Sequence, residues 1–319
     1  MGETVEESYP VELSPPDIAP YRSGNTGVDY VTSFDSGVPG PHVMVCAVTH
    51  GNEICGAIAL DFLLRAELRP TRGRLTFAFN NYRAFLSFNP AYPTLSRFVD
   101  EDFNRLWSPE VLDGPRASAE LVRARELRPL IDEVDFLLDI HSMQTSVAPL
   151  MLAGPLAKGC DFARRLGYPA HVVMDTGHTA GRRLRDYGAF GDPASERNAL
   201  LIEAGQHWEH SAAEVSLETA LRFLLALDVI DRGFAEANLK ADPAPQKVIE
   251  VTDVVTIQSG NFRFVDTYNG LEVIPRKGTL LGADGASEVR TPYDDCVLVM
   301  PSRRLYPGHT AVRLGRFVG

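Results

Sequence analysis

The stretch VMVCAVTHGNEICGAIALDFLLRA, residues 43–66, contains the patterns of a strand, a turn and a helix in succession. Residues 43–48 are continuously apolar, which predicts a strand that is buried on both faces. In 54–66 the apolar residues recur at helical spacing, so we expect a helix there. The turn THGNE between them then lies at the carboxyl end of a strand, where parallel sheets gather their ligands.

The same alternation of strand and helix patterns continues along the chain. Strands are predicted at 74–80, 135–140, 150–152, 170–174 and 199–203, and helices at 118–131 and about 212–230. Near-continuous apolar strands separated by helices indicate an α/β fold. We therefore expect a mostly parallel or mixed sheet with helices on both faces.

The pattern changes at ADPAPQ, residues 241–246, which has two prolines and no apolar anchor. Short alternating apolar runs separated by Gly, Pro and Asp follow, and they predict a small all-β module. We therefore expect a catalytic domain over 1–242 and a small β-rich C-terminal domain over 243–319. The small size of the second unit favours a role as a cap or wall for the first.

The overall composition excludes several classes of partner. The 319 residues include 31 Lys and Arg against 42 Asp and Glu, a net charge of −11, which argues against nucleic-acid binding. No apolar run reaches the roughly 18 residues of a membrane span, and the acidic N-terminus lacks the pattern of a secretory signal. We expect a cytoplasmic protein that acts on a small molecule, and homo-oligomers remain possible.

The four cysteines show no metal-binding or redox spacing, and they are Cys46, Cys55, Cys160 and Cys296. In a reducing compartment such cysteines are most simply small apolar core residues. We expect all four to be buried and free of disulfides.

A candidate metal centre is formed by two histidines and one glutamate. His50 and Glu53 stand three apart in THGNE, where a predicted strand gives way to a helix. His141 follows the predicted strand 135–140, and the ends of parallel strands share one sheet edge. Three protein ligands with an open position are typical of a catalytic zinc site, although the same set also forms the non-haem iron triad. Asp139 could orient an imidazole or bond to backbone.

A second histidine pair, His207 and His210, has the same spacing in GQHWEH. We favour His50 and Glu53 because they have a third ligand on a matching strand end. This choice leaves Glu203, at the end of the predicted strand 199–203, free to act as the general base.

An arginine-containing stretch, SRFVDEDFNRLW, lies between the predicted ligands and includes Arg97, Asn104 and Arg105. Guanidinium groups bind carboxylates bidentately and can polarise a carbonyl oxygen. The alternative is that these arginines pair with the acidic residues at 100–102 on the surface.

Taken in order, THGNE, RFVDEDFNR, DIHSM and IEAGQ closely resemble the aspartoacylase and succinylglutamate desuccinylase family of zinc carboxypeptidase-like hydrolases. The resemblance covers about 43–210 through these motifs. It implies that His50, Glu53 and His141 bind one Zn²⁺ per chain. It also implies that Glu203 is the proton shuttle.

The resemblance further implies that Arg97 polarises the scissile carbonyl, and that Asn104 and Arg105 hold a substrate carboxylate. The family's other substrate-binding residues have no clean match in this chain. The stretch GHTAGRRLRDYGAF offers His178, Arg182, Arg183, Arg185 and Tyr187 as candidates, unless it is a charged surface loop. Tyr306 in the β-rich part is a candidate for a tyrosine that reaches into the pocket.

The predicted activity is zinc-dependent hydrolysis of the amide bond of a small N-acyl amino acid or related carboxylate by a metal-activated water. The alternatives are a metallocarboxypeptidase acting on peptides, a non-haem iron oxygenase and a non-catalytic metal-binding protein. The sequence contains neither a GxSxG elbow nor a Walker-type phosphate loop, which argues against serine hydrolases and nucleotide hydrolases. The acyl group and the amino acid of the substrate stay open.

Overall fold

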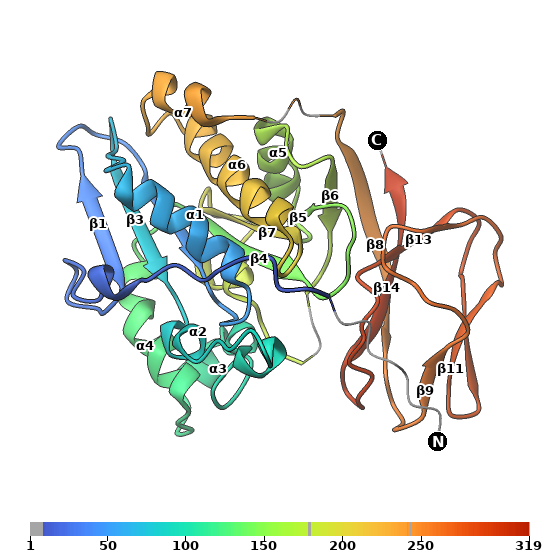
Figure 1. Cartoon of the computed structure of the whole chain (residues 1–319). Coiled ribbons are helices and arrows are strands. Elements are labelled where there is room, and N and C mark those ends of the chain that lie inside the picture. Colours follow the sequence, from blue (N-terminus) through green and yellow to red (C-terminus); the bar gives the residue numbers. More distant parts are fainter. Residues whose placement is uncertain (1–8, 178–179, 241, 243, 319) are drawn as a thin grey trace.

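The computed structural model describes residues 9–177, 180–240, 242 and 244–318. An eleven-stranded mixed sheet runs through the molecule in the order β1-β3-β2-β4-β7-β5-β6-β8-β14-β13-β10 (Figure 1). The strands in its first part are β1 (Val31–Asp35), β2 (His42–Ala47), β3 (Arg74–Phe79), β4 (Phe136–Met143), β5 (Leu150–Leu152), β6 (His171–Met174) and β7 (Asn198–Gln206). Strands β3, β2, β4 and β7 are parallel, whereas β1 and β5 are antiparallel to their neighbours β3 and β7. The predicted α/β fold class is confirmed.

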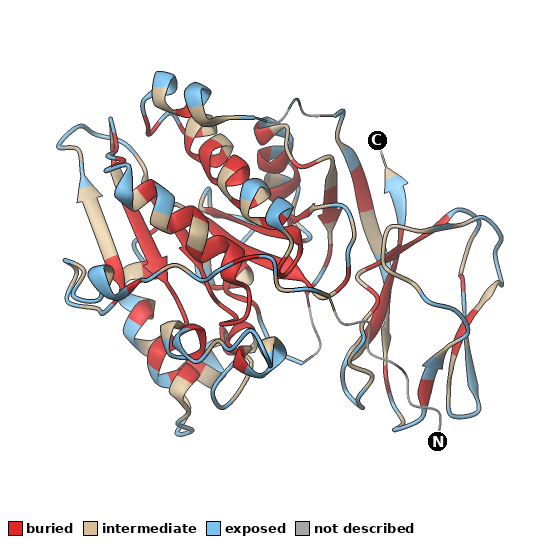
Figure 2. Cartoon of the chain, viewed as in Figure 1, coloured by how far each residue is buried: buried red, intermediate tan, exposed pale blue. Residues whose placement is uncertain are grey.

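Helices cover both faces of this sheet. They are α1 (Ile54–Arg65), α2 (Tyr82–Leu86), α3 (Pro109–Leu112), α4 (Ala119–Ile131), α5 (Ala157–Leu166), α6 (His210–Ala226) and α7 (Arg232–Asn238). Helices α1, α5 and α6 pack into the core on one face, and α4 packs into the core on the other (Figure 2). In the described part of the chain, no helix combines the length and the apolar character needed to cross a membrane.

Two strands extend further than their apolar patterns indicate. The prediction that β4 ends at residue 140 is wrong, because its ladder with β7 pairs His141 with Glu203 and continues to Met143 and Gln206. The prediction that β7 ends at residue 203 is wrong for the same reason. His141 and Glu203 therefore lie inside paired strands and not just beyond them.

Among the described residues after α7, strands are the regular secondary structure, and loops connect them. The strands are β8 (Lys247–Thr256), β9 (Phe262–Phe264), β10 (Val273–Ile274), β11 (Leu280–Asp284), β12 (Ser287–Arg290), β13 (Cys296–Val299) and β14 (Thr310–Val318). Strand β8 pairs in parallel with β6, so the main sheet continues into this part, while β12, β11 and β9 form a separate antiparallel sheet. The boundary between 1–242 and 243–319 stays a prediction.

All four cysteines are buried and free, as predicted. Cys46, in β2, and Cys55, in α1, belong to the two cores that lie on opposite faces of the sheet. Their role is packing.

The turn between β2 and α1 is packed too closely for a side chain at Gly51. A Cβ at this position would overlap the backbone of Ala84, Phe85 and Ser96. The Gly51 N–H donates to the Arg97 carbonyl at 3.0 Å, which ties the turn to the next loop. Glycine is therefore what lets the turn carrying His50 lie against the loop carrying Arg97.

We expect Gly51→Ala to lower the free energy of unfolding by about 2 kcal/mol, because backbone must move to admit the methyl group. Urea denaturation followed by circular dichroism measures this change. Gly260→Ala is the matched control, since a Cβ there meets nothing within 4 Å. Equal midpoints for the two variants would contradict the packing argument.

Candidate metal centre

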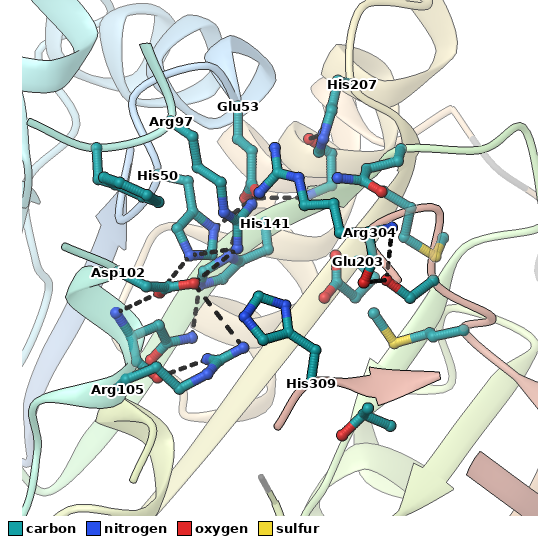
Figure 3. Close-up of a pocket in the computed structure, with 18 of the residues that line it drawn as sticks. His50, Glu53, Arg97, Asp102, Arg105, His141, Glu203, His207, Arg304 and His309 are labelled. Carbon is teal, nitrogen blue, oxygen red and sulfur yellow. Dashed lines mark hydrogen bonds and ion pairs between the residues drawn. The ribbon is translucent and has the colours of Figure 1, made fainter. Parts of the chain in front are cut away.

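The structure brings the three predicted metal ligands together (Figure 3). His50 lies in the turn after β2, Glu53 is the N-cap of α1, and His141 lies in β4. His50 Nδ1 is 2.7 Å from Glu53 Oε1, and His141 Nδ1 is 2.9 Å from Glu53 Oε2. One donor atom from each residue lies within 4.8 Å of the others, and all three side chains are buried. This set of donors fits a catalytic zinc site with three protein ligands.

Each histidine is oriented by a carboxylate on its other nitrogen. His141 Nε2 lies 2.8 Å from Asp139 Oδ2, and Asp139 in turn accepts a hydrogen bond from Thr49 at 2.8 Å. His50 Nε2 lies 3.0 Å from Asp102 Oδ1. Carboxylates behind the ligating imidazoles are typical of metal sites, because they set ring orientation and raise the basicity of the ligand. Of the two alternatives for Asp139, the structure supports the orienting one.

The surroundings of Glu53 favour its negatively charged form. Burial alone would raise the pKa of Glu53, but the adjacent His50 and His141 imidazoles overcome this and hold that pKa well below its usual range. The Ser142 backbone N–H also donates to Glu53 Oε2 at 3.2 Å. A buried, ionised carboxylate between two imidazoles is suited to a divalent cation.

Glu203 lies next to this centre on the neighbouring strand. It is the register partner of His141 in the β4–β7 ladder, so both side chains leave the sheet on the same face. Glu203 is 7% exposed, lines the same cavity as the three donors, and its Oε2 has no hydrogen-bond partner. Burial raises the pKa of Glu203 to about 8, and a cation bound beside it would favour the ionised form that a general base requires. A carboxyl group with this free oxygen is available for proton transfer.

Arg97 reaches the centre from the loop after α2. Its Nη1 donates to Glu53 Oε1 at 3.3 Å, and its Nη2 donates to Asp102 Oδ2 at 3.1 Å. The structure therefore contains the pairing of an arginine with an acid at 100–102 that the sequence left open, and the pair is Arg97 with Asp102. It takes place in the site and not on the surface, because the Asp102 side chain is only 23% exposed.

Asp102 belongs to the site, whereas its sequence context suggested only a surface acid. It orients His50, pairs with Arg97 and accepts the Asn104 N–H at 2.9 Å as the N-cap of the next turn. The sequence pattern that could have identified Asp102 is Asp-x-Asn within VDEDFN, because this spacing is typical of an N-cap side chain that accepts a backbone N–H.

Asn104 and Arg105 also lie in the cavity wall. Asn104 Nδ2 is 3.5 Å from His141 Nε2, and its Oδ1 accepts the Leu184 N–H at 2.8 Å. Arg105 Nη1 donates to the Asn104 carbonyl at 2.7 Å, and its side chain is 21% exposed. Burial lowers the pKa of Arg105 to about 10, which still leaves it charged near neutrality.

The candidates from 178–187 separate into two groups. Arg183 lines the cavity, whereas Arg182 is exposed and outside its lining. Arg185 is buried against two backbone carbonyls, and Tyr187 donates to Asp132 at 2.7 Å, so both are engaged away from the cavity. His178 lies outside the described residues. A substrate-binding role for Arg182, Arg185 and Tyr187 finds no support in these positions.

The second histidine pair does not converge. His207 is buried, with Nδ1 2.8 Å from Ser142 Oγ, whereas His210 is exposed at the first residue of α6. Burial lowers the pKa of His207 to about 3, so its imidazole is neutral. His207 lines the cavity and was missed as a wall residue.

The cavity has a volume of about 780 Å³. The C-terminal part of the chain supplies one wall of it, through Arg304, Tyr306 and His309 in the loop between β13 and β14 and through Arg313 in β14. Tyr306, a candidate from the sequence, lies in this wall and is 63% exposed. The other wall residues had no signal in the sequence, because their position depends on how β14 pairs with β8.

Comparison with known proteins gives a consistent result. A family model described as the succinylglutamate desuccinylase/aspartoacylase catalytic domain matches residues 39–227. A succinylglutamate desuccinylase of Pseudoalteromonas atlantica is 23% identical over 295 residues, which cover 85% of this chain and 79% of that protein. An N-acyl-aromatic-L-amino acid amidohydrolase (carboxylate-forming) of Xenopus laevis is 29% identical over 157 residues, 43% of this chain and 48% of that protein.

Solved structures share the fold. The X-ray structure of succinylglutamate desuccinylase from Vibrio parahaemolyticus superposes with a TM-score of 0.67 at 19% identity, covering 91% of this chain and 87% of that one. At this identity the likeness shows that the two chains share a fold.

Proposed function

Because this chain belongs to the succinylglutamate desuccinylase and aspartoacylase family, we propose that it is a zinc-dependent enzyme that hydrolyses the amide bond of a small N-acyl amino acid or related carboxylate. The observation that carries the proposal is the convergence of His50, Glu53 and His141 beside the free carboxyl oxygen of Glu203. When bound by these three side chains, zinc would supply a Lewis acid and lower the pKa of a water molecule toward about 7.

Glu203 acts as general base and then as general acid. Its Oε2 accepts a proton from the attacking water and later delivers that proton to the leaving nitrogen. Both transfers need an oxygen that no other group occupies, and Glu203 Oε2 meets this requirement. The low exposure of the side chain limits loss of the proton to bulk water.

The arginines and Asn104 position the substrate. Arg97 donates to the carbonyl oxygen as negative charge develops on it, which is stabilising because the guanidinium is already held in place by Asp102. Asn104 and Arg105 hold the substrate carboxylate, so that the attack becomes effectively intramolecular.

A panel of N-acyl amino acids tests this proposal, with bound metal measured in the same samples. We expect each substrate whose free carboxylate is replaced by a neutral amide to lose about 100-fold in kcat/KM, since a charge-assisted pair with Arg105 is lost. Equal rates for acid and amide would contradict the role of Asn104 and Arg105. Peptides belong in the panel too, because release of a C-terminal amino acid from them would favour a metallocarboxypeptidase.

A further inference from the structure

A glutamate on helix α4 lies fully buried against the loop that carries Arg97. Glu120 Oε1 accepts the Val99 N–H at 2.6 Å and the Asn81 side-chain amide at 3.0 Å. Glu120 Oε2 accepts the N–H groups of residues 100 and 101 at 3.0 and 3.2 Å. Three successive backbone N–H groups therefore converge on one carboxylate, an arrangement that binds anions in many proteins.

These bonds fix a segment that little regular structure holds. Between α2 and the turn Phe103–Arg105, the one regular element is the short 3-10 turn Pro93–Ser96. The N–H groups of residues 99–101 therefore need partners outside a helix or a sheet ladder, and Glu120 supplies them. Burying a carboxylate is costly unless donors satisfy both of its oxygens, so the carboxylate and the loop depend on each other.

The anchored residues 99–101 lie between two side chains of the metal centre. Arg97 precedes them and donates to Glu53 Oε1 at 3.3 Å, and Asp102 follows them and lies 3.0 Å from His50 Nε2. A guanidinium stabilises developing charge best when its position is fixed before the reaction. A shift of residues 99–101 would therefore move Arg97 away from the position that the proposed mechanism requires.

The later part of the same loop has anchors of its own. Asn104 Oδ1 accepts the Leu184 N–H at 2.8 Å, and the Trp107 N–H donates to the Arg182 carbonyl at 3.2 Å. The residues that hold the substrate carboxylate are thus tied to another segment of the chain. Loss of the Glu120 anchor should affect Arg97 more than substrate binding.

We propose that Glu120 is a positioning residue that holds Arg97 in place for amide hydrolysis by tying residues 99–101 to α4. The kinetic part of this inference rests on the proposed function. Glutamine is a sharp probe of the anchor, because each oxygen of Glu120 accepts two N–H groups. In either orientation, the amide NH₂ of a glutamine would face two N–H groups and could accept from neither.

A double-mutant cycle with Arg97 tests the positioning role at saturating zinc, with rates expressed per folded chain. We expect Glu120→Gln to lower kcat by about 100-fold and to change KM by less than about threefold. Arg97→Ala should cost about 100-fold as well, and the double variant no more than about tenfold beyond Arg97→Ala alone. Two losses that multiply to about 10⁴-fold would overturn the role, because Glu120 would then act independently of Arg97.

A second buried glutamate provides the matched control. Glu218 on α6 accepts the Arg222 Nε–H and the Lys240 N–H, each at 2.8 Å, and it lies outside the cavity lining. Glu218→Gln should keep the kcat and KM of the parent protein. Glu120→Asp keeps two acceptor oxygens on a shorter side chain, so its loss in kcat should be nearer tenfold, about a tenth of that in Glu120→Gln. It replaces Glu120→Gln in the cycle if circular dichroism shows that the glutamine variant is unfolded.

Hydrogen exchange of the purified protein tests the anchor without any measurement of activity. The amides of residues 99–101 should exchange at least about tenfold faster in Glu120→Gln than in the parent protein, and at the parent rate in Glu218→Gln. Equal exchange in Glu120→Gln and the parent would overturn the anchor. Faster exchange in Glu120→Gln, combined with a parent protein that hydrolyses no N-acyl amino acid, would support the anchor and refute the proposed function.

Discussion

Replacing Glu203 with glutamine is expected to leave zinc binding intact and to lower kcat by about a thousandfold or more. Glutamine has nearly the same shape, so the pairing of β4 with β7 and the three metal donors stay in place. It cannot accept the proton of the attacking water, and both proton transfers are lost. Steady-state kinetics on the best substrate of the panel, with zinc per chain measured by mass spectrometry, gives both quantities.

Glu196→Gln is the control for the loss of a carboxylate as such, because Glu196 is exposed and lies outside the cavity lining. It should match the parent protein in rate and in zinc. A near-normal rate in Glu203→Gln would exclude Glu203 as the base. Loss of zinc in that variant would mean that Glu203 holds the ion.

Replacing His50 with alanine is expected to weaken zinc binding by at least about 100-fold and to abolish turnover. His50 is the ligand best suited to this test, because its removal leaves Glu53 paired with His141 and Asp102 paired with Arg97. The buried acids then keep partners, and the chain should remain folded by circular dichroism. Zinc affinity is measured by competition with a chromophoric chelator.

His210→Ala serves as the counterpart, since His210 is exposed and outside the centre. It should bind zinc like the parent protein. The opposite result, with zinc retained in His50→Ala and lost in His210→Ala, would indicate that the metal binds at the second histidine pair, His207 and His210.

Much of the centre could be predicted from the sequence because its signals are local. The turn THGNE joins a buried strand to a helix, so the spacing of His50 and Glu53 is enough to place both at one sheet edge. His141 and Glu203 follow from the same rule, because they lie near the carboxyl ends of two neighbouring parallel strands, although both strands continue past them. The motif order then identified the family that the comparisons support.

The rest of the site depends on long-range pairing that no local pattern encodes. Arg313 reaches the cavity only because β14 pairs with β8 and β8 extends the main sheet at β6. Arg185 and Tyr187 come from the same charged stretch as Arg183, yet the chain turns them toward backbone carbonyls and Asp132. The charges of these three residues and their closeness in sequence do not predict where each side chain lies, because each position depends on the tertiary arrangement of a loop.

The most direct measurement for the whole account is a crystal structure of the zinc-loaded protein with anomalous data at the zinc edge. We predict one strong anomalous peak about 2.0–2.2 Å from donor atoms of His50, Glu53 and His141, with the Glu203 side chain facing the open position. A peak held by other residues, or coordination of the ion by Glu203 itself, would contradict the account.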